Sequence, residues 1–580
     1  MKRFFSMMLL VILATALVAA PFVEDVLLTP STNPRTGGRL YMTLDTAPQS
    51  FNFYGTLDNA AYTVMGQMLS GLIDEHPVTS ELRPGLAESW TVSEDGKEVV
   101  FHLRDVKWSD DTPFTADDVI FTMENFVMNR FAEGNSIARF TIGGELVKWE
   151  KVDERNVKAI LPEPYAAFYR VLAHAYIYPK HIHEGTFNAE DRGSVNKVWL
   201  TNSPVEKFVG TGPYIIEQYI TDQKVIMRRN PNFWKVDVYG NQLPYFGKVE
   251  YLIVRDSQVK LAMFMSGQID YMPVDGRDFP NLKQRELAGG PFKIFLAEPT
   301  QPTPSPVHIS FNWDTANPQL AELFKNKDFR AAVEFVVDRD RIIDEVYNGL
   351  AVYGGVPVLP ANRDFYNPNI EDIRRSYNPT EAKKLLDNVG IIDRNRDGYR
   401  QFSDGKRVEI VILASNSQVD QDIAYILSQD LEDVGIKVHL SILEPGLTGQ
   451  RFGAGDFEMG IRAFGNQPDP QLRKAIWQPG THLYYWHRTS RNPDTNEPIF
   501  ENMQDWELRV FELFELGQVE MDHSIRRTYY DEWQEIYAEY LPVIFVCKGM
   551  NLSAANIFLG NVEQHASGLV SFATWTAFRK

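Results

Sequence analysis

Residues 210–234, GTGPYIIEQYITDQKVIMRRNPNFW, form the stretch that most narrows the folds open to this chain. The opening Gly-Thr-Gly-Pro predicts a turn in which the glycines supply positive φ angles and the proline fixes φ. Two β-rich runs follow, Tyr214–Ile220 and Lys224–Arg228, and only three residues separate them. This spacing predicts a β-hairpin with a short loop, closed by a turn that carries Phe233 and Trp234.

A second stretch, residues 86–119, predicts another hairpin followed by a helix. Glu94–Lys97 is typical of the turn between two strands. Thr115 is placed to cap the helix, and the carboxylate of Asp118, three residues on, suits the positive helix end. We therefore expect Asp117 and Asp118 to stabilise a helix start rather than to act as catalytic acids.

Both stretches resemble signatures of the family 5 extracellular solute-binding proteins, the ligand-capturing subunits of ABC importers for peptides, oligosaccharides and nickel. The first carries TGPY and then RNPNFW, and the second carries LAESW and then VKWSDDTPFTADDV. Asp111 departs from the family pattern because glycine is usual there. The resemblance runs from about Gly38 to the chain end. It implies an α/β, two-lobed periplasmic-binding-protein fold of type II, of the large class with a subdivided first lobe and a hinge between lobes.

The length of the chain also predicts more than one domain, since 580 residues exceed what one hydrophobic core normally supports. Four prolines within residues 299–306 predict a stiff crossover between lobes. Helices and strands are predicted to alternate after it, which indicates an α/β second lobe. The expected division is a signal peptide at 1–20, a linker at 21–37, the first lobe at 38–75, 76–205 (its second part) and 206–300, the second lobe at 301–530, and a return to the first lobe at 531–580.

The first twenty residues predict secretion. Two basic residues precede an apolar run from Met7 to Val18, and cleavage is expected after Ala20. No later apolar run reaches about 18 residues, so we expect a soluble mature protein. The single cysteine, Cys547, allows no internal disulfide, and no cysteine ends the signal peptide to carry a lipid. These features predict a periplasmic or extracellular protein that is not a lipoprotein.

One loop of the second lobe fits the calcium-binding pattern Asp-x-Asn-x-Asp-Gly. Asp393, Asn395 and Asp397 place oxygen ligands at positions one, three and five, and Asp404 stands at position twelve. Calcium prefers such ligands, although the closing residue is Asp rather than the longer Glu and nearby arginines add positive charge. A polar turn before a strand at Val408 is the alternative. No other cofactor is expected.

The ligand site is expected in the loop Ala463–Pro470. The resemblance implies this, because peptide-binding relatives carry an aspartate four residues before a proline, and its carboxylate meets the α-ammonium of the peptide. Counting back from Pro470 gives Asn466 here, and Asp469 takes the role if the register differs. A buried ammonium without a counter-charge is costly, whereas an amide donates and accepts and so suits sugar hydroxyls.

Aromatic side chains are candidates for stacking on pyranose rings, because Tyr and Trp combine an apolar face with a polar tip. Aromatic residues make up 12% of the chain, so core packing is the competing explanation for each ring. The candidates are Phe53 and Tyr54 in the first lobe, and Trp477, Tyr484, Tyr485 and Trp486 in the second.

No catalytic pattern is found: the chain has no G-x-S-x-G, no glycine-rich phosphate loop and no zinc spacing. The net charge of −19 argues against nucleic acid or an anionic membrane surface as a partner. The sequence therefore predicts a monomeric binding protein, not an enzyme, that captures a short oligosaccharide between its lobes and delivers it to the permease of an ABC importer. An oligopeptide is the alternative ligand, and a secreted hydrolase is a distant alternative function.

Overall fold

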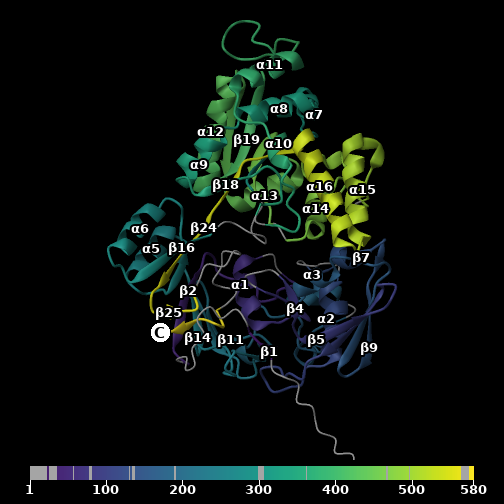
Figure 1. Ribbon diagram of the computed structural model, residues 1–580, viewed down its shortest axis with the longest axis vertical. Coiled ribbons are helices and arrows are strands. Elements are labelled where there is room, and N and C mark those ends of the chain that lie inside the picture. Colours follow the sequence, from purple (N-terminus) through teal and green to yellow (C-terminus); the bar gives the residue numbers. More distant parts are fainter. Residues whose placement is uncertain are drawn as a thin grey trace, which may run out of the picture.

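The structure, a computed structural model, places the chain in two lobes that lie one above the other (Figure 1). It describes residues 22–24, 36–55, 58–76, 81–129, 131–132, 137–188, 191–297, 306–360, 362–465, 468–495, 497–562 and 574–580. The main core of the lower lobe is built largely from residues between Leu40 and Tyr271, and that of the upper lobe from residues between Val307 and Cys547. Two separate cores agree with the expectation from chain length.

The first predicted hairpin is confirmed and forms half of a four-stranded sheet in the lower lobe. β11 (Tyr214–Ile220) pairs antiparallel with β12 (Lys224–Arg229), and β12 pairs antiparallel with β14 (Lys248–Ile253). β14 then pairs in parallel with β2 (Arg39–Leu44), which comes from the start of the described chain. Strands that are distant in sequence therefore share this sheet.

The Gly-Thr-Gly-Pro turn before β11 lies against the end of α1 (Asn59–Met68). A Cβ atom added to Gly210 would lie 2.0 Å from the carbonyl oxygen of Met68, and one added to Gly212 would lie 2.5 Å from that of Gln67. Neither glycine has a positive φ, so the predicted reason for glycine at these positions was wrong. Close approach of two backbones, which no side chain would permit, is the reason.

The second predicted hairpin is confirmed as well. β5 (Ala87–Val92) and β6 (Glu98–Leu103) pair antiparallel, and β10 (Asn156–Ile160) and β9 (Lys148–Asp153) extend them to four strands. Figure 1 shows this second sheet at the lower right, away from the connections between the lobes. It belongs to the part of the first lobe predicted at 76–205.

The helix that follows this hairpin, α2 (Ala116–Thr122), begins as predicted. Thr115 and Asp118 form a capping box, and the Oδ2 atom of Asp118 accepts from the backbone N–H of Thr115 at 3.0 Å. In the preceding turn Asp111 has a φ of 70°, the left-handed conformation that glycine adopts most easily. Aspartate is among the residues that tolerate it, which accounts for the departure from the family pattern.

The upper lobe contains a five-stranded mixed sheet covered by helices, as predicted for an α/β lobe. The strands follow the order β20 (Lys437–Leu443), β19 (Glu409–Ser415), β21 (Met459–Arg462), β17 (His308–Phe311) and β22 (Val543–Phe545). Helices around it include α8 (Lys327–Val336), α9 (Arg339–Tyr347), α11 (Pro379–Val389), α12 (Gln418–Asp433), α15 (Asp505–Val519) and α16 (His523–Tyr540).

The chain passes between the lobes on the left side of Figure 1. One passage joins β16 (Phe292–Ala297) of the lower lobe to β17 of the upper lobe, and residues 298–305 within it lie outside the described residues. The other follows β22 through β23 (Cys547–Gly549) to β24 (Asn551–Asn556), which pairs with β16 and β15 (Tyr271–Pro273). The return to the first lobe was predicted to begin at residue 531. In the structure it comes later, after β22, because α16 packs on α15 and β22 still pairs with β17 of the upper lobe.

The described chain contains further α-helices and strands, and none of its helices is both long and apolar enough to span a lipid bilayer. They are β1 (Phe22–Val23), β3 (Ile73–Glu75), β4 (Leu82–Pro84), β7 (Thr141–Ile142), β8 (Glu145–Leu146), α3 (Phe168–Ala173), α4 (Lys180–His183), β13 (Lys235–Val236), α5 (Ser257–Met265), α6 (Phe279–Leu287), α7 (Pro318–Lys325), β18 (Ala351–Tyr353), α10 (Ile370–Ile373), α13 (Pro445–Ala454), α14 (Lys474–Trp477), β25 (Leu559–Gly560) and β26 (Phe578–Arg579).

The buried carboxylate of Asp118 gives the first testable prediction. Besides Thr115, it accepts from the backbone N–H of Lys180 at 2.9 Å and from the indole N–H of Trp108 at 3.3 Å. We expect Asp118→Ala to lower the free energy of unfolding by about 2–4 kcal/mol, because a helix cap is lost and donors are left unpaired. Urea unfolding followed by circular dichroism measures this loss.

The neighbouring Asp117 supplies a matched control for this experiment. Its carboxylate is 42% exposed and pairs with Lys151 at 2.7 Å. Asp117→Ala should cost less than about 1 kcal/mol, as is usual for surface ion pairs. Equal losses for the two variants would contradict the role assigned to Asp118.

Candidate ligand site between the lobes

The lobes touch on the side opposite the chain connections, where α3 and α15 lie in Figure 1. The backbone N–H of Ala166 in the lower lobe donates to the carbonyl oxygen of Gln518 in the upper lobe at 3.2 Å. Leu472 of the upper lobe packs with the core residues of the lower lobe. The space between this contact and the two chain connections is therefore bordered by both lobes. A ligand bound there could contact side chains of both.

Four charged or polar side chains lie near this boundary, and we call them the interlobe site. Arg139 stands on the 3-10 turn Ile137–Phe140 and Tyr165 precedes α3, both in the lower lobe. Asp469 and Arg473 belong to the upper lobe, where Asp469 caps the 3-10 turn that ends at Arg473. Electrostatic interactions join Tyr165 to Asp469 and Arg139 to Arg473 across the boundary.

The loop that was predicted to bind ligand borders the interlobe site. It leaves β21 at Arg462 and passes Gly465, where an added Cβ atom would lie 3.0 Å from the Nη2 atom of Arg473. The loop backbone therefore lies close to that guanidinium. Asn466, the residue on which the sugar argument depends, lies outside the described residues, so its role stays a prediction.

Asp469, the other carboxylate proposed for this loop, is held in a buried ion pair. Its Oδ2 atom accepts from Nη1 of Arg526 at 2.7 Å, and its Oδ1 atom accepts from Nη2 at 2.7 Å. The two side chains are 6% and 5% exposed. Oδ1 also accepts from the backbone N–H of Gln471 at 2.9 Å. Both carboxylate oxygens are thus already engaged within the upper lobe.

Further hydrogen bonds secure this ion pair. The Nε atom of Arg526 donates to the carbonyl oxygen of Gly517 at 2.7 Å, and the hydroxyl of Tyr530 donates to Oε1 of Gln471 at 2.8 Å. Burial alone would lower the pKa of Arg526, but the Asp469 carboxylate outweighs burial and raises it. A peptide ammonium could approach Asp469 only by competing with a charge-assisted, two-pronged hydrogen bond.

The pKa values of Arg139 and Arg473 are lowered, in contrast to that of Arg526. Burial lowers the pKa of Arg473 to about 10, and the positive charge of Arg139 adds to this effect. Burial also lowers the pKa of Arg139, opposed only by the hydroxyls of Tyr165 and Tyr62. Neither guanidinium forms an ion pair with a described carboxylate, and the buried Nε atom of Arg473 has no hydrogen-bond partner.

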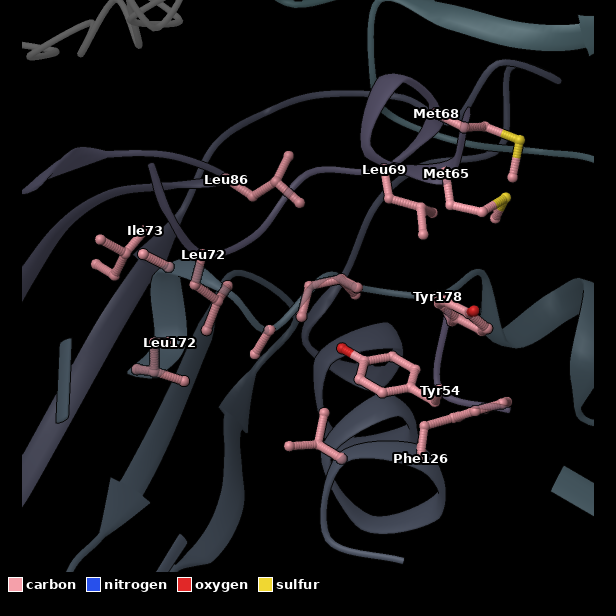
Figure 2. Close-up of a cluster of buried hydrophobic side chains, with 14 of the residues drawn as sticks. Tyr54, Met65, Met68, Leu69, Leu72, Ile73, Leu86, Phe126, Leu172 and Tyr178 are labelled. Atoms are coloured by element: carbon pink, nitrogen blue, oxygen red, sulfur yellow. The ribbon is translucent and has the colours of Figure 1, made fainter. Parts of the chain in front are cut away.

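Four of the six aromatic candidates pack in the cores instead of facing a ligand. Trp477, Tyr484 and Trp486 are at most 1% exposed in the upper core, and the Tyr484 hydroxyl donates to Glu507 at 3.1 Å. Tyr54 is 1% exposed, and Figure 2 shows it in the lower core close to Tyr178. Core packing, the competing explanation, accounts for these rings because burial of large aromatic surface is strongly favourable.

The remaining two aromatic candidates are half-buried. Tyr485 lies 5.9 Å from the ring of Phe464, and the guanidinium of Arg462 sits 5.2 Å from the Tyr485 ring centroid. Phe53 contacts Tyr62, a residue that also interacts with Arg139 of the interlobe site. These two rings keep a surface that a ligand could use, and their contact with a ligand stays a prediction.

The predicted calcium loop satisfies its oxygen atoms internally. The two carboxylate oxygens of Asp393 accept from the backbone N–H groups of Asp397 at 3.2 Å and Gly398 at 3.1 Å. Asp397 pairs with Arg407 at 2.8 Å, and Asp404 pairs with Lys406 at 3.1 Å. Asn395 also accepts within the loop. Across the described ranges, no group of three or more His, Cys, Asp or Glu side chains is arranged to hold a metal ion.

Sequence reasoning missed the two interlobe arginines. Arg473 follows the predicted loop closely, yet an arginine in a chain with 58 basic residues gives no signal by itself. Arg139 lies in a segment that no motif marked. Their place near the boundary between the lobes is a property of the folded chain, and local sequence does not show it.

Comparison with known proteins shows the family. The family model of the bacterial extracellular solute-binding proteins, family 5, matches residues 81–478. The chain belongs to this family. The resemblance inferred from the two hairpin segments is thus confirmed, and so is the expectation of a protein class that binds solutes.

Two relatives illustrate the range of similarity. A probable ABC transporter-binding protein from Deinococcus radiodurans is 28% identical over 378 residues, which cover 64% of this chain and 63% of the relative. A periplasmic alpha-galactoside-binding protein from Rhizobium meliloti is 31% identical over 387 residues, which cover 62% of this chain and 54% of the relative. The chain spans less than two thirds of the length of either relative.

Two solved structures share the fold over 94% of this chain. The periplasmic binding protein MelB from Agrobacterium fabrum, in complex with stachyose, matches with a TM-score of 0.76 at 20% identity over 85% of its chain. The oligopeptide-binding protein AppA from Bacillus subtilis, in complex with a nonapeptide, matches with a TM-score of 0.74 at 20% identity over 100% of its chain. The predicted two-lobed periplasmic-binding-protein fold is confirmed.

The buried Asp469–Arg526 pair gives the second prediction. We expect Asp469→Ala to lower the free energy of unfolding by about 3–5 kcal/mol, because Arg526 would remain buried without a counter-charge. The control is Glu532→Ala, which breaks a surface pair of the same two-pronged geometry, with both distances to Arg509 at 2.7 Å and Glu532 41% exposed. That variant should lose at most about 1 kcal/mol. Urea unfolding that ranks the two losses in the reverse order would contradict the structural role of Asp469.

Calcium binding at the 393–404 loop stays a prediction of the sequence pattern. If calcium binds there, EGTA lowers the melting temperature of the purified protein, and Asp393→Ala removes that effect. Differential scanning fluorimetry with and without calcium measures both. An unchanged melting temperature in EGTA would contradict calcium binding.

Proposed function

We propose that this protein is the extracytoplasmic solute-binding subunit of an ABC importer, and that it holds a short oligosaccharide between its lobes. Family membership and a site with side chains from both lobes support the proposal. A ligand that contacts both lobes stabilises their closed arrangement, and that arrangement is what a permease would recognise. Capture and release are the whole activity, so no residue acts as a catalyst.

The state of Asp469 supports a sugar rather than a peptide. It is the one carboxylate in the loop Ala463–Pro470, and Arg526 occupies both of its oxygens. A peptide ammonium bound here would need that carboxylate as its counter-charge. Sugar hydroxyls need only neutral donors and acceptors. The relative named for alpha-galactosides and the similar fold bound to stachyose agree with this choice.

An oligopeptide is the second candidate ligand. The similar fold of AppA, solved with a nonapeptide, motivates it. In that case the ammonium would have to meet a group other than Asp469. For either ligand we propose that the protein works as a monomer in the periplasm or outside the cell, with a membrane permease as its partner.

Thermal denaturation in the presence of candidate ligands tests the proposed function. A ligand at 100 times its dissociation constant stabilises the folded protein by about 2.7 kcal/mol, which raises the melting temperature measurably. We expect a rise with one series of α- or β-linked tri- and tetrasaccharides, and none with tri- to pentapeptides. Chromatography of the sugar after incubation should show it uncleaved.

Two results would contradict the proposal in different ways. A rise with peptides alone would replace the sugar by the second candidate. Cleavage of the bound sugar would exclude a purely binding function.

A further inference from the structure

One apolar side chain of the upper lobe is buried in the core of the lower lobe. Leu472 stands on the 3-10 turn Pro470–Arg473 of the upper lobe, yet its side chain is 5% exposed and packs with the lower core. Among the described residues between 307 and 547, it alone belongs to that core. The hydrogen bond from the N–H of Ala166 to the carbonyl oxygen of Gln518, at 3.2 Å, joins the lobes as well. We call these two contacts the latch.

The upper lobe holds its half of the latch in a fixed position. The Oε1 atom of Gln518 accepts from the Nε2 atom of Gln471 at 3.2 Å, so the end of α15 is tied to the turn that carries Leu472. The buried ion pair of Asp469 with Arg526 fixes the start of the same turn, because Asp469 caps it. Groups that are already ordered lose little entropy when they form a contact.

The lower lobe presents its half on a segment with a restricted backbone. Ala166 follows Pro162 and Pro164, whose rings fix φ, and it stands just before α3. The N–H of Phe168 donates to the carbonyl oxygen of Tyr165 at 3.1 Å, which closes a turn around Ala166. Both halves of the latch are therefore formed within their own lobes and need little rearrangement to meet.

Open space beside the latch shows that the contact is small. A cavity of about 290 Å³ is lined by Gly143 and Glu163 of the lower lobe and by residues near the end of α15 that include Gln518 and Val519. The lobes are thus separated next to the point where Gln518 touches the lower lobe. A contact of this extent can form and break while each lobe stays folded, as a hinge motion requires.

We infer that the latch stabilises the closed arrangement of the lobes by itself, and that Leu472 contributes most of its effect. An apolar side chain that is buried only when the lobes close favours closure through its transfer free energy, and one backbone hydrogen bond adds less. Leu472 is thus a positioning residue, since it acts between the lobes. The consequence for ligand rests on the proposed function: a ligand held by both lobes should bind more weakly by the factor by which the closed population falls.

Distances between two spin labels in the ligand-free protein, measured by double electron–electron resonance, test the inference. One label replaces Val152 on β9 and the other replaces Leu508 on α15, since these side chains are 56% and 36% exposed. The one native cysteine, Cys547, is buried and inert. We expect a short-distance, closed population in the parent protein. Leu472→Ala should lower the ratio of closed to open protein about 10- to 50-fold.

Two variants serve as controls. Leu472→Met conserves volume and apolar character, so it should keep the closed population close to that of the parent. Leu323→Ala removes a leucine of the same 5% exposure from within the upper core. It should lower the melting temperature without changing the distance between the lobes, because it lies outside the latch.

Three results would overturn the inference. They are an unchanged ratio in Leu472→Ala, a parent protein that shows the long distance alone, and a loss of the closed population in Leu323→Ala as large as in Leu472→Ala. No ligand is present in these measurements, so their outcome is independent of the choice between sugar and peptide. The thermal screen with candidate ligands tests that choice separately.

Discussion

The pairing of residues 543–556 with both lobes is the constraint on which the rest of the structure depends. β22 adds an edge strand to the upper sheet, and β24, a few residues later, becomes the middle strand between β15 and β16 of the lower lobe. A middle strand satisfies the hydrogen-bonding groups of both neighbours, so neither β15 nor β16 can complete its sheet without the end of the chain. Pairing strands that are so far apart in sequence costs a large loop-closure entropy.

The interlobe site is tied to this same segment. Arg526, the partner of Asp469, stands on α16, and α16 leads directly into β22. Two more buried arginines donate to carbonyl oxygens in this segment or just before it, Arg339 to Phe545 and Arg330 to Tyr540. The loop that borders the candidate ligand site is therefore fixed to the element that crosses between the lobes. The same buried contacts therefore fix both the geometry of the candidate site and the path of the chain between the lobes.

The buried arginines of the described chain are held by oxygen atoms of their own lobe. Four of them donate hydrogen bonds to such oxygens and so stabilise the fold: Arg330, Arg339, Arg400 and Arg526. Arg139 and Arg473 lie near the boundary between the lobes and are half-buried, and neither forms an ion pair with a described carboxylate.

The sequence by itself determined the local elements and the family. Both hairpins and the Thr115–Asp118 capping box depend on residues a few positions apart, where turn chemistry and side-chain spacing decide the backbone. Tertiary structure alone decided that Gly210 and Gly212 serve close backbone contact, that Tyr54, Trp477, Tyr484 and Trp486 belong to the cores, and that Asp469 pairs with Arg526. It also placed Arg139 and Arg473 near the boundary between the lobes. Each of these depends on which distant segments become neighbours, and local spacing carries no record of that.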